Sequence, residues 1–166
     1  MKNKKSAEWV LEAAKQGNAD GQSNLGTMYL YGIGGAAQDY SEALKWFRKS
    51  AEQGNADGQR NLGLMYDRGM GVVQDYEEAS KWYRIAAEQG NAVAQFNLGE
   101  MYDQGRGVIQ DHIQAHMWFN LSAAGSKGTN QEQAAKQRDS VARKMTAQQI
   151  AEAQRLAREW KPKQAK

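Results

Sequence analysis

The stretch Asn55-Ala-Asp-Gly-Gln-Arg-Asn-Leu-Gly-Leu-Met-Tyr66 decides the fold, because the chain carries it three times. Residues 18–29 match it at nearly every position, and residues 91–102 keep its Asn-Leu-Gly-x-Met-Tyr ending. The copies begin 37 and then 36 residues apart. A period of about 30 to 40 residues is typical of helical solenoids, in which each repeat buries its apolar face against its neighbours. The sequence therefore predicts an all-α repeat protein.

Each copy predicts two helices joined by a Gly-x-Gly loop. In the middle copy, Gln59, Leu62, Gly63 and Tyr66 fall on one face of a helix over about residues 56–68. The second helix begins at an Asp with Glu or Gln three residues later, as in a capping box. It ends at a Gly suited to the left-handed conformation, and an Asn follows as the N-cap of the next helix. These positions are Asp39, Asp75 and Asp111, then Glu42, Glu78 and Gln114, then Gly54 and Gly90, and finally Asn18, Asn55 and Asn91.

A glycine recurs in the middle of every first helix, where glycine costs about 1 kcal/mol relative to alanine. We expect each of these glycines to let a neighbouring helix approach the backbone. The glycines are Gly26, Gly63 and Gly99, and the predicted partners are Ala43, Ala79 and Ala115 on the second helices. A tryptophan also recurs in every second helix, at Trp46, Trp82 and Trp118, and is interpreted as packing between helices. Val72 and Val108 of the loops are expected to tuck under the helices.

The composition excludes some kinds of function and structure. There is no cysteine, which excludes a disulfide framework and thiol catalysis. No apolar run approaches the roughly 20 residues of a membrane span. The first five residues resemble the basic start of a signal peptide, but residues 6–17 are amphipathic rather than apolar. The sequence is compatible with a cytoplasmic protein as written, and with a periplasmic or secreted one from which a leader was removed.

The repeated pattern, with its Asn-Leu-Gly-x-Met-Tyr, Gly-x-Gly-Val and Ala-x-x-Trp-Tyr-x-x-Ala-Ala-Glu-Gln-Gly-Asn segments, resembles the Sel-one-like repeat family, a relative of the tetratricopeptide repeats. The likeness covers about residues 6–124, and residues 57–94 match almost throughout. It implies a right-handed α/α superhelical solenoid that mediates protein–protein contacts. It also implies a bacterial origin, because residues 149–160 resemble the C-terminal cap of bacterial members. Members that bind or hydrolyse β-lactams carry cysteine pairs, so that activity is not expected in this cysteine-free chain.

We predict one repeat domain over residues 1–166, with three helix–turn–helix repeats at 18–54, 55–90 and 91–125. Residues 6–17 form the second half of a preceding repeat, and residues 130–160 form two capping helices. Thr146 and Gln149 have capping-box spacing. The stripe Ile150, Ala153, Ala157 and Trp160 is expected to close the last repeat, since an open end exposes apolar surface.

The face of each first helix opposite the repeated leucine is the predicted partner-binding surface, which lines the concave groove in related solenoids. It varies between copies while the core positions recur, as expected where one face packs and the other meets ligand or solvent. Its residues are Asp20, Ser23, Thr27, Leu30 and Tyr31, then Asp57, Arg60, Leu64, Asp67 and Arg68, and then Val93, Phe96, Glu100, Asp103 and Gln104. A second-rank series is Asn24, Asn61 and Asn97.

This surface suggests a groove for a peptide or helix with apolar anchors and some positive charge. The alternative is an ordinary variable solvent face. Phe96 is the main candidate anchor, because a phenylalanine on a solvent face is unusual. We expect Phe96→Ala to weaken partner binding with little loss of stability.

Two other functions stay open at this stage. A hydrolase acting in the groove, for instance on cell wall, is one alternative, although no Ser/His/Asp arrangement or carboxylate pair stands out. Binding of nucleic acid or an acidic partner is another. Residues 127–166 carry 10 basic and 4 acidic side chains, whereas residues 1–126 carry 12 and 15. We favour a monomeric, non-enzymatic scaffold that binds a protein or peptide and needs no cofactor.

The two histidines are a further candidate site. His112 and His116 lie four residues apart, so both could face one metal ion, with Asp111 as a conceivable third ligand. The pattern lacks the glutamate of a metalloprotease helix. We therefore predict no metal site.

Overall fold

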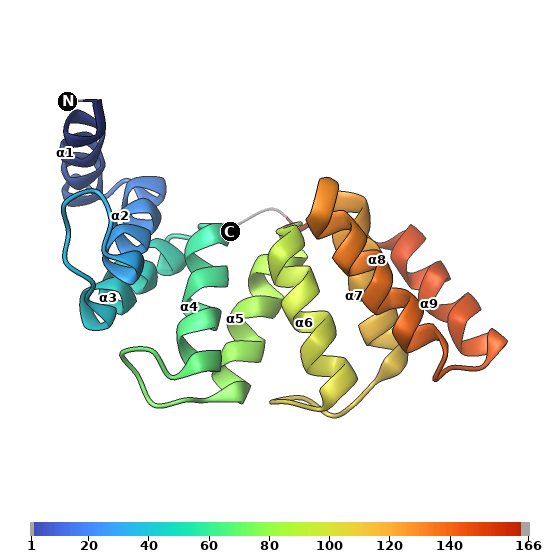
Figure 1. The fold of residues 1–166 in the computed structure, drawn as a ribbon. Helices are drawn as coiled ribbons and strands as arrows, with labels where there is room; N and C mark the ends of the chain where they lie inside the picture. The colour runs from blue at the N-terminus through green and yellow to red at the C-terminus, as the bar shows by residue number, and fades with distance from the viewer. Residues whose placement is uncertain (1, 164–166) are drawn as a thin grey trace. The chain divides into compact units, whose positions relative to one another are not determined.

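The computed structural model describes the backbone of residues 2–163 and the side chains of residues 7–163. Over this range the chain forms nine helices and no strand, so the predicted all-α class is confirmed (Figure 1). The helices are α1 (Lys2–Lys15), α2 (Ala19–Tyr31), α3 (Tyr40–Glu52), α4 (Ala56–Arg68), α5 (Tyr76–Glu88), α6 (Ala92–Gln104), α7 (His112–Gly125), α8 (Gly128–Ala142) and α9 (Ala147–Glu159).

The helices form two compact units, which divide between Trp82 and Tyr83 inside α5. In unit 1, up to Trp82, α2 packs against α1, α3 and α4, and α3 packs against α4. In unit 2, from Tyr83 onward, α7 packs against α6, α8 and α9. Each unit is therefore a stack of helices that are close neighbours in the sequence, as in an α/α solenoid. The assignment of the whole chain to one repeat domain remains a prediction.

The predicted caps hold the helix starts. The side chain of Asn55 accepts a hydrogen bond from the Gly58 amide at 2.8 Å, and Asn18 and Asn91 do the same in their copies. Asp39 accepts from two amides at the start of α3. The predicted capping box also requires the Glu42 side chain to accept from the Asp39 amide, and this part of the prediction is wrong. Glu42 accepts a hydrogen bond from the Trp46 indole instead, at 3.2 Å. Thr146 and Gln149 do form the complete box at the start of α9.

Two of the mid-helix glycines, Gly26 and Gly99, face aromatic rings rather than the predicted alanines. A Cβ on Gly26 would lie 2.7 Å from the Phe47 ring, and one on Gly99 would lie 2.9 Å from the Phe119 ring. Both rings are buried. Ala43 and Ala115 are buried too, but they are not the nearest neighbours of these glycines. The physical reason is that a flat ring fills the space over a bare backbone more completely than a methyl group does.

The unit 1 core gathers Leu30, Ala43, Phe47, Ala51, Leu62 and Met65, with Val72 packed against it as predicted. In unit 2, α9 closes the last repeat against α7. Ala153 and Ala157 are buried, and the Trp160 ring meets the Trp118 ring edge-on at a centroid distance of 6.3 Å. The chain then runs back to the end of α5, where the Lys163 amide donates to the Glu88 carbonyl at 2.7 Å.

Across residues 2–163, none of the helices combines the length and apolar character needed to cross a lipid bilayer.

Candidate functional site

The predicted binding face is partly interior in unit 1. Ser23 and Leu30 are only 5% and 4% exposed, and Leu30 belongs to the core cluster. These two assignments to an open face were wrong, because α4 packs directly on α2 and covers that side. Asn61 is buried as well, so it is not placed to clamp a ligand. The residues of the unit 1 set that remain at least partly exposed are Asp20, Asn24, Thr27, Tyr31, Asp57, Arg60, Leu64, Asp67 and Arg68.

Some exposed polar residues of that set are engaged with neighbours. Asp20 accepts a hydrogen bond from the Asn55 amide group at 2.6 Å, and Arg60 lies 3.9 Å from Asp57. Tyr31 is 62% exposed at the end of α2. Unit 1 thus presents this face as scattered residues rather than as one apolar surface.

Unit 2 brings two of the predicted anchors together. Val93 and Phe96 of α6 line a small cavity of about 140 Å³. Val93 is 42% exposed, and Phe96 is half-buried. The Phe96 ring meets the buried Phe119 ring edge-on at a centroid distance of 5.4 Å, so Phe96 lines the cavity while held against the core and is not a free aromatic on the surface. The other lining residues are Ala92, Ser122, Ser126, Asn130 and Gln133.

Two residues of this cavity were missed by the sequence reasoning. Asn130 and Gln133 lie on α8 and are exposed. Within the described part of the chain, their side-chain amides make no hydrogen bond. The repeat period would have indicated them: the N-cap of α8, Lys127, follows Asn91 by 36 residues, which places α8 where the first helix of a further repeat would start.

Asp103 of the predicted set serves a different contact. Its carboxylate accepts from the Lys144 ammonium at 2.7 Å and lies 3.2 Å from Nδ1 of His112. The side chain is 19% exposed. Asp103 therefore ties the end of α6 to the start of α7 and to the turn after α8. Glu100 and Asn97 are half-buried on α6, and Gln104 is exposed.

The histidines lie in different environments. His112 is next to Asp103, whereas His116 is 3% exposed, and its buried Nδ1 has no hydrogen-bond partner among the described residues. Burial lowers the pKa of His116, and the positive charge of Arg138 lowers it further. The Asp111 carboxylate caps α7 by accepting from the Ile113 and Gln114 amides. In residues 7–163, no three His, Cys, Asp or Glu side chains gather where they could hold a metal ion.

Four of the nine basic side chains of residues 127–163 are paired with acids inside unit 2. Arg155 bonds to Glu152 and Glu159, and these hydrogen bonds raise its pKa. Arg138 pairs with Asp139, Lys144 with Asp103, and Lys163 with Glu88. Such pairing reduces the charge available to bind phosphate groups.

The fold and the caps define a class: tandem α/α hairpins related to tetratricopeptide repeats. The Sel1 repeat family model matches residues 3–18, 19–55, 56–91 and 92–126. The chain belongs to the Sel1 repeat family. No curated protein matches the sequence significantly.

Three solved structures resemble the chain. A protective antigen present in uropathogenic Escherichia coli strains, which displays an SLR fold, is 31% identical with a TM-score of 0.69. The match covers 94% of this chain and 40% of the antigen, so the chain spans two fifths of the antigen's length. A Sel1 repeat protein from Oxalobacter formigenes is 35% identical, with a TM-score of 0.65 over 76% of this chain and 95% of that one.

The Helicobacter pylori cysteine-rich protein B shares the fold, at 20% identity and a TM-score of 0.61 over 79% of this chain and 93% of that one. All three neighbours are bacterial, in agreement with the predicted origin. Sel1 repeat proteins are generally scaffolds for protein–protein interaction and are typically not enzymes.

Proposed function

We propose that this chain is a binding scaffold that holds a peptide or helix of a partner protein on the α6–α8 side of unit 2. The observation that carries the proposal is the cavity at Val93 and Phe96. It combines an apolar floor with the free amides of Asn130 and Gln133. An apolar pocket with a few polar groups at its edge is the usual form of a specific binding site.

The size of the cavity suits one side chain. About 140 Å³ is close to the volume that accepts a benzene-sized group in a protein interior. An aliphatic or aromatic anchor would rest on Phe96 and Val93, while the amides of α8 could bond the backbone of the partner segment. A single buried anchor surrounded by polar contacts is how most binding energy is concentrated in protein interfaces.

The two alternative functions have less support. Among the described residues, the buried group whose pKa is shifted is His116, and it does not line this cavity. An enzyme would need such a group in contact with its substrate. A nucleic-acid surface would rest on the other five basic side chains of residues 127–163, because Arg138, Lys144, Arg155 and Lys163 are paired with acids.

The test uses peptides selected from a random library against the whole protein. Val93→Lys places a charge at the mouth of the cavity without disturbing the core, and we expect it to weaken binding at least about tenfold. Ile109→Lys is the matched control, because Ile109 is 91% exposed in the α6–α7 loop and lies outside the cavity. Peptides that bind Val93→Lys as tightly as they bind Ile109→Lys would contradict the proposal.

A further inference from the structure

The junction that holds the Val93–Phe96 cavity has a counterpart in unit 1. In unit 1 the Ser50 hydroxyl of α3 donates to the Ala19 carbonyl at 2.7 Å. In unit 2 the Ser122 hydroxyl of α7 donates to the Ala92 carbonyl, also at 2.7 Å. The same hydrogen bond therefore marks equivalent places in the two units, and the helices around them can be compared position by position.

In unit 1 this place is closed, because α4 packs directly on α2. The Asn55 amide group at the start of α4 donates to the Asp20 carboxylate of α2 at 2.6 Å. Gly58 lies so close to α3 that a Cβ added to it would stand 2.6 Å from the Ser50 Cβ. A hydrogen-bonded pair and a bare backbone thus bring α4 down onto its neighbours.

In unit 2 the sequence has lost both of these features. Val93 and Lys127 occupy the positions of the hydrogen-bonded pair, 73 and 72 residues later, and valine has no polar atom to accept the bond. Asn130 occupies the position of the glycine and brings a side chain into that space. Over the described residues, α8 packs against α7 and makes no comparable contact with α6. The residues of this junction therefore keep the cavity open.

The open junction offers free polar groups but no charge. None of the residues that line the cavity is charged. The side chains of Ser126, Asn130 and Gln133 line it and make no hydrogen bond to another described residue. A hydroxyl or carboxamide group can both donate and accept, so these three side chains suit a partner that presents N–H and C=O groups together.

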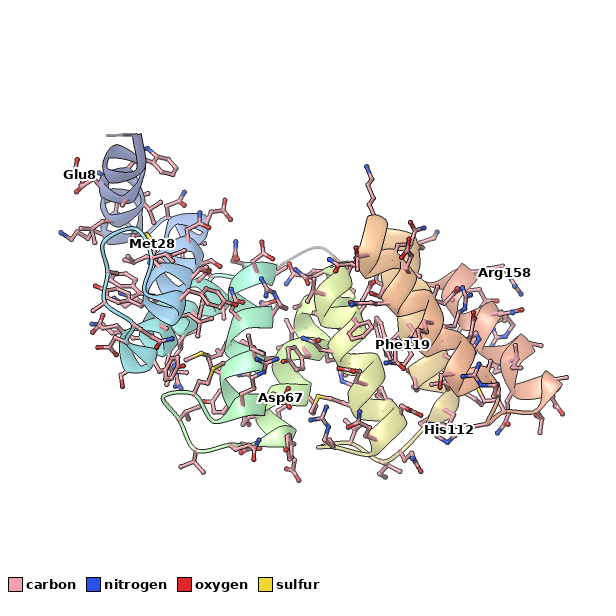
Figure 2. The ribbon with its side chains drawn as sticks, viewed as in Figure 1. Glu8, Met28, Asp67, His112, Phe119 and Arg158 are labelled. Atoms are coloured by element: carbon pink, nitrogen blue, oxygen red, sulfur yellow. The ribbon has the colours of Figure 1, made fainter. Side chains whose placement is uncertain are left out.

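An extended backbone presents such groups, whereas a helix bonds most of its own N–H and C=O groups internally. The size of the cavity agrees with this distinction. A helix lies in a groove by several anchors spaced three or four residues apart, but about 140 Å³ accepts one side chain. The Phe119 ring that holds Phe96 in place is labelled on α7 in Figure 2.

We propose that the open junction between α6 and α8 binds an uncharged segment of a partner protein in extended conformation. One aliphatic or aromatic side chain of the segment rests on Phe96 and Val93, and its backbone bonds to Asn130 and Gln133. This inference rests on the proposed function and chooses between the two forms of partner, peptide or helix, that the proposed function allows.

The test uses the whole protein and nine-residue peptides with blocked ends, no charged residue and one leucine or phenylalanine at the centre. Peptides that bind are remade with an ester in place of each amide in turn, which removes one backbone donor at a time. We expect esters beside the anchor to weaken binding at least about threefold. Raising the salt concentration from about 0.05 to 0.5 M should change the affinity less than about twofold, because no charge lines the cavity.

Protein variants locate the contacts. Asn130→Gly restores the residue of unit 1 and should let α8 close the cavity, so peptide binding should weaken at least about tenfold. Gln133→Ala removes one carboxamide and should weaken it at least about threefold. The matched controls are Thr129→Gly and Gln137→Ala, because both residues are exposed on α8 and lie outside the cavity. The controls should bind as the wild type does.

Three outcomes would overturn the inference. The first is a bound peptide whose transferred nuclear Overhauser effects are those of a helix. The second is binding that no ester weakens, and the third is binding by charged library peptides alone. If Val93→Lys still abolishes binding in these cases, the proposed function stands and only the extended, uncharged form of the partner is wrong. Binding that Val93→Lys leaves unchanged would instead contradict the proposed function itself.

Discussion

At the scale of single residues, the glycine and the ring that meet inside the first and third repeats determine how closely two helices approach. Gly26 lies against the 0%-exposed Phe47 ring, at a distance where a Cβ would stand 2.7 Å from a ring atom. Real side chains do not approach so closely, so an added methyl group must displace a ring that is packed on all sides.

Gly26→Ala is therefore expected to destabilise the protein by about 1–3 kcal/mol, even though alanine is the better helix former. Urea unfolding followed by circular dichroism measures the change. The double variant Gly26→Ala/Phe47→Leu should show non-additive costs, because the smaller side chain relieves the contact. A gain in stability on Gly26→Ala alone would show that the ring is not held against this backbone.

His116 gives a prediction on pH. Its pKa is lowered in the folded protein from the ordinary value of 6.5, by burial first and by Arg138 second. Below about pH 6.5 the unfolded chain binds the proton more readily than the folded one, so stability falls as the pH drops from 6.5 toward the lowered folded pKa. Above pH 6.5, His116 is neutral in both the folded and the unfolded state, so it does not make the free energy of unfolding depend on pH.

Denaturant melts between pH 5 and 7.5 check this expectation. His116→Asn should flatten the pH dependence, while His112→Asn should leave the contribution of His116 in place. If the pH dependence of stability persisted in His116→Asn and disappeared in His112→Asn, it would come from His112, which lies beside Asp103, and the prediction would be contradicted.

At the scale of helices, the joint between the first and second repeats depends on one asparagine that makes two hydrogen bonds. Asn55 accepts from the Gly58 amide at 2.8 Å and donates to the Asp20 carboxylate at 2.6 Å. It thus caps α4 and ties the start of α4 to the start of α2. This double use explains why so short a joint can set the position of one first helix on the next.

Asn55→Ala is expected to cost about 1–2 kcal/mol, the usual value of a lost N-cap. Asn24→Ala is the matched control, because Asn24 is exposed on α2 and its side chain makes no hydrogen bond to another described residue. The control should change stability by less than about 0.5 kcal/mol. Equal effects of the two variants in thermal melts would argue against capping as the cause.

The helices and their caps could be predicted because the signals are local. Asparagine and aspartate before a helix act on amides two or three residues away, whatever the rest of the fold does. The partner of Glu42 could not be predicted in this way, since the Trp46 indole competes for its carboxylate across one helical turn. The burial of Ser23 and Leu30 could not be predicted either. Whether a residue of α2 is buried depends on where α4 lies, and α4 is distant from these residues in the sequence.

At the scale of the whole chain, residues 160–163, which follow α9, are part of unit 2. The Trp160 ring meets the buried Trp118 ring, and a Cβ added to Gly90 would lie 3.9 Å from the Trp160 ring. Lys163 bonds to Glu88 through both its backbone amide and its side-chain ammonium. The terminal segment therefore covers α7 and the turn between α5 and α6.

Trp160→Ala should lower the stability of unit 2 by about 2–4 kcal/mol, because a large aromatic contact is lost. Hydrogen exchange should show the loss of protection in α7 and α9. Trp9→Ala is the control, since Trp9 is 66% exposed on α1 and its removal should be close to neutral. Equal losses of stability in Trp160→Ala and Trp9→Ala would show that the Trp160 contact with Trp118 does not stabilise unit 2.

The candidate site shows the limit of sequence reasoning at this scale. Val93 and Phe96 were found because they are apolar at positions that are polar in other copies. The free amides of Asn130 and Gln133 were not found, because α8 departs from the repeat sequence while it keeps the repeat position. Phe96 also proves to be held by Phe119, so Phe96→Ala would cost stability as well as binding.

The most direct test of the binding proposal maps where a selected peptide touches the whole protein, by amide chemical-shift changes in NMR. The account predicts changes centred on residues 92–96 of α6 and 126–133 around the start of α8, and their loss in Val93→Lys. A peptide that binds with no change at these residues would contradict it.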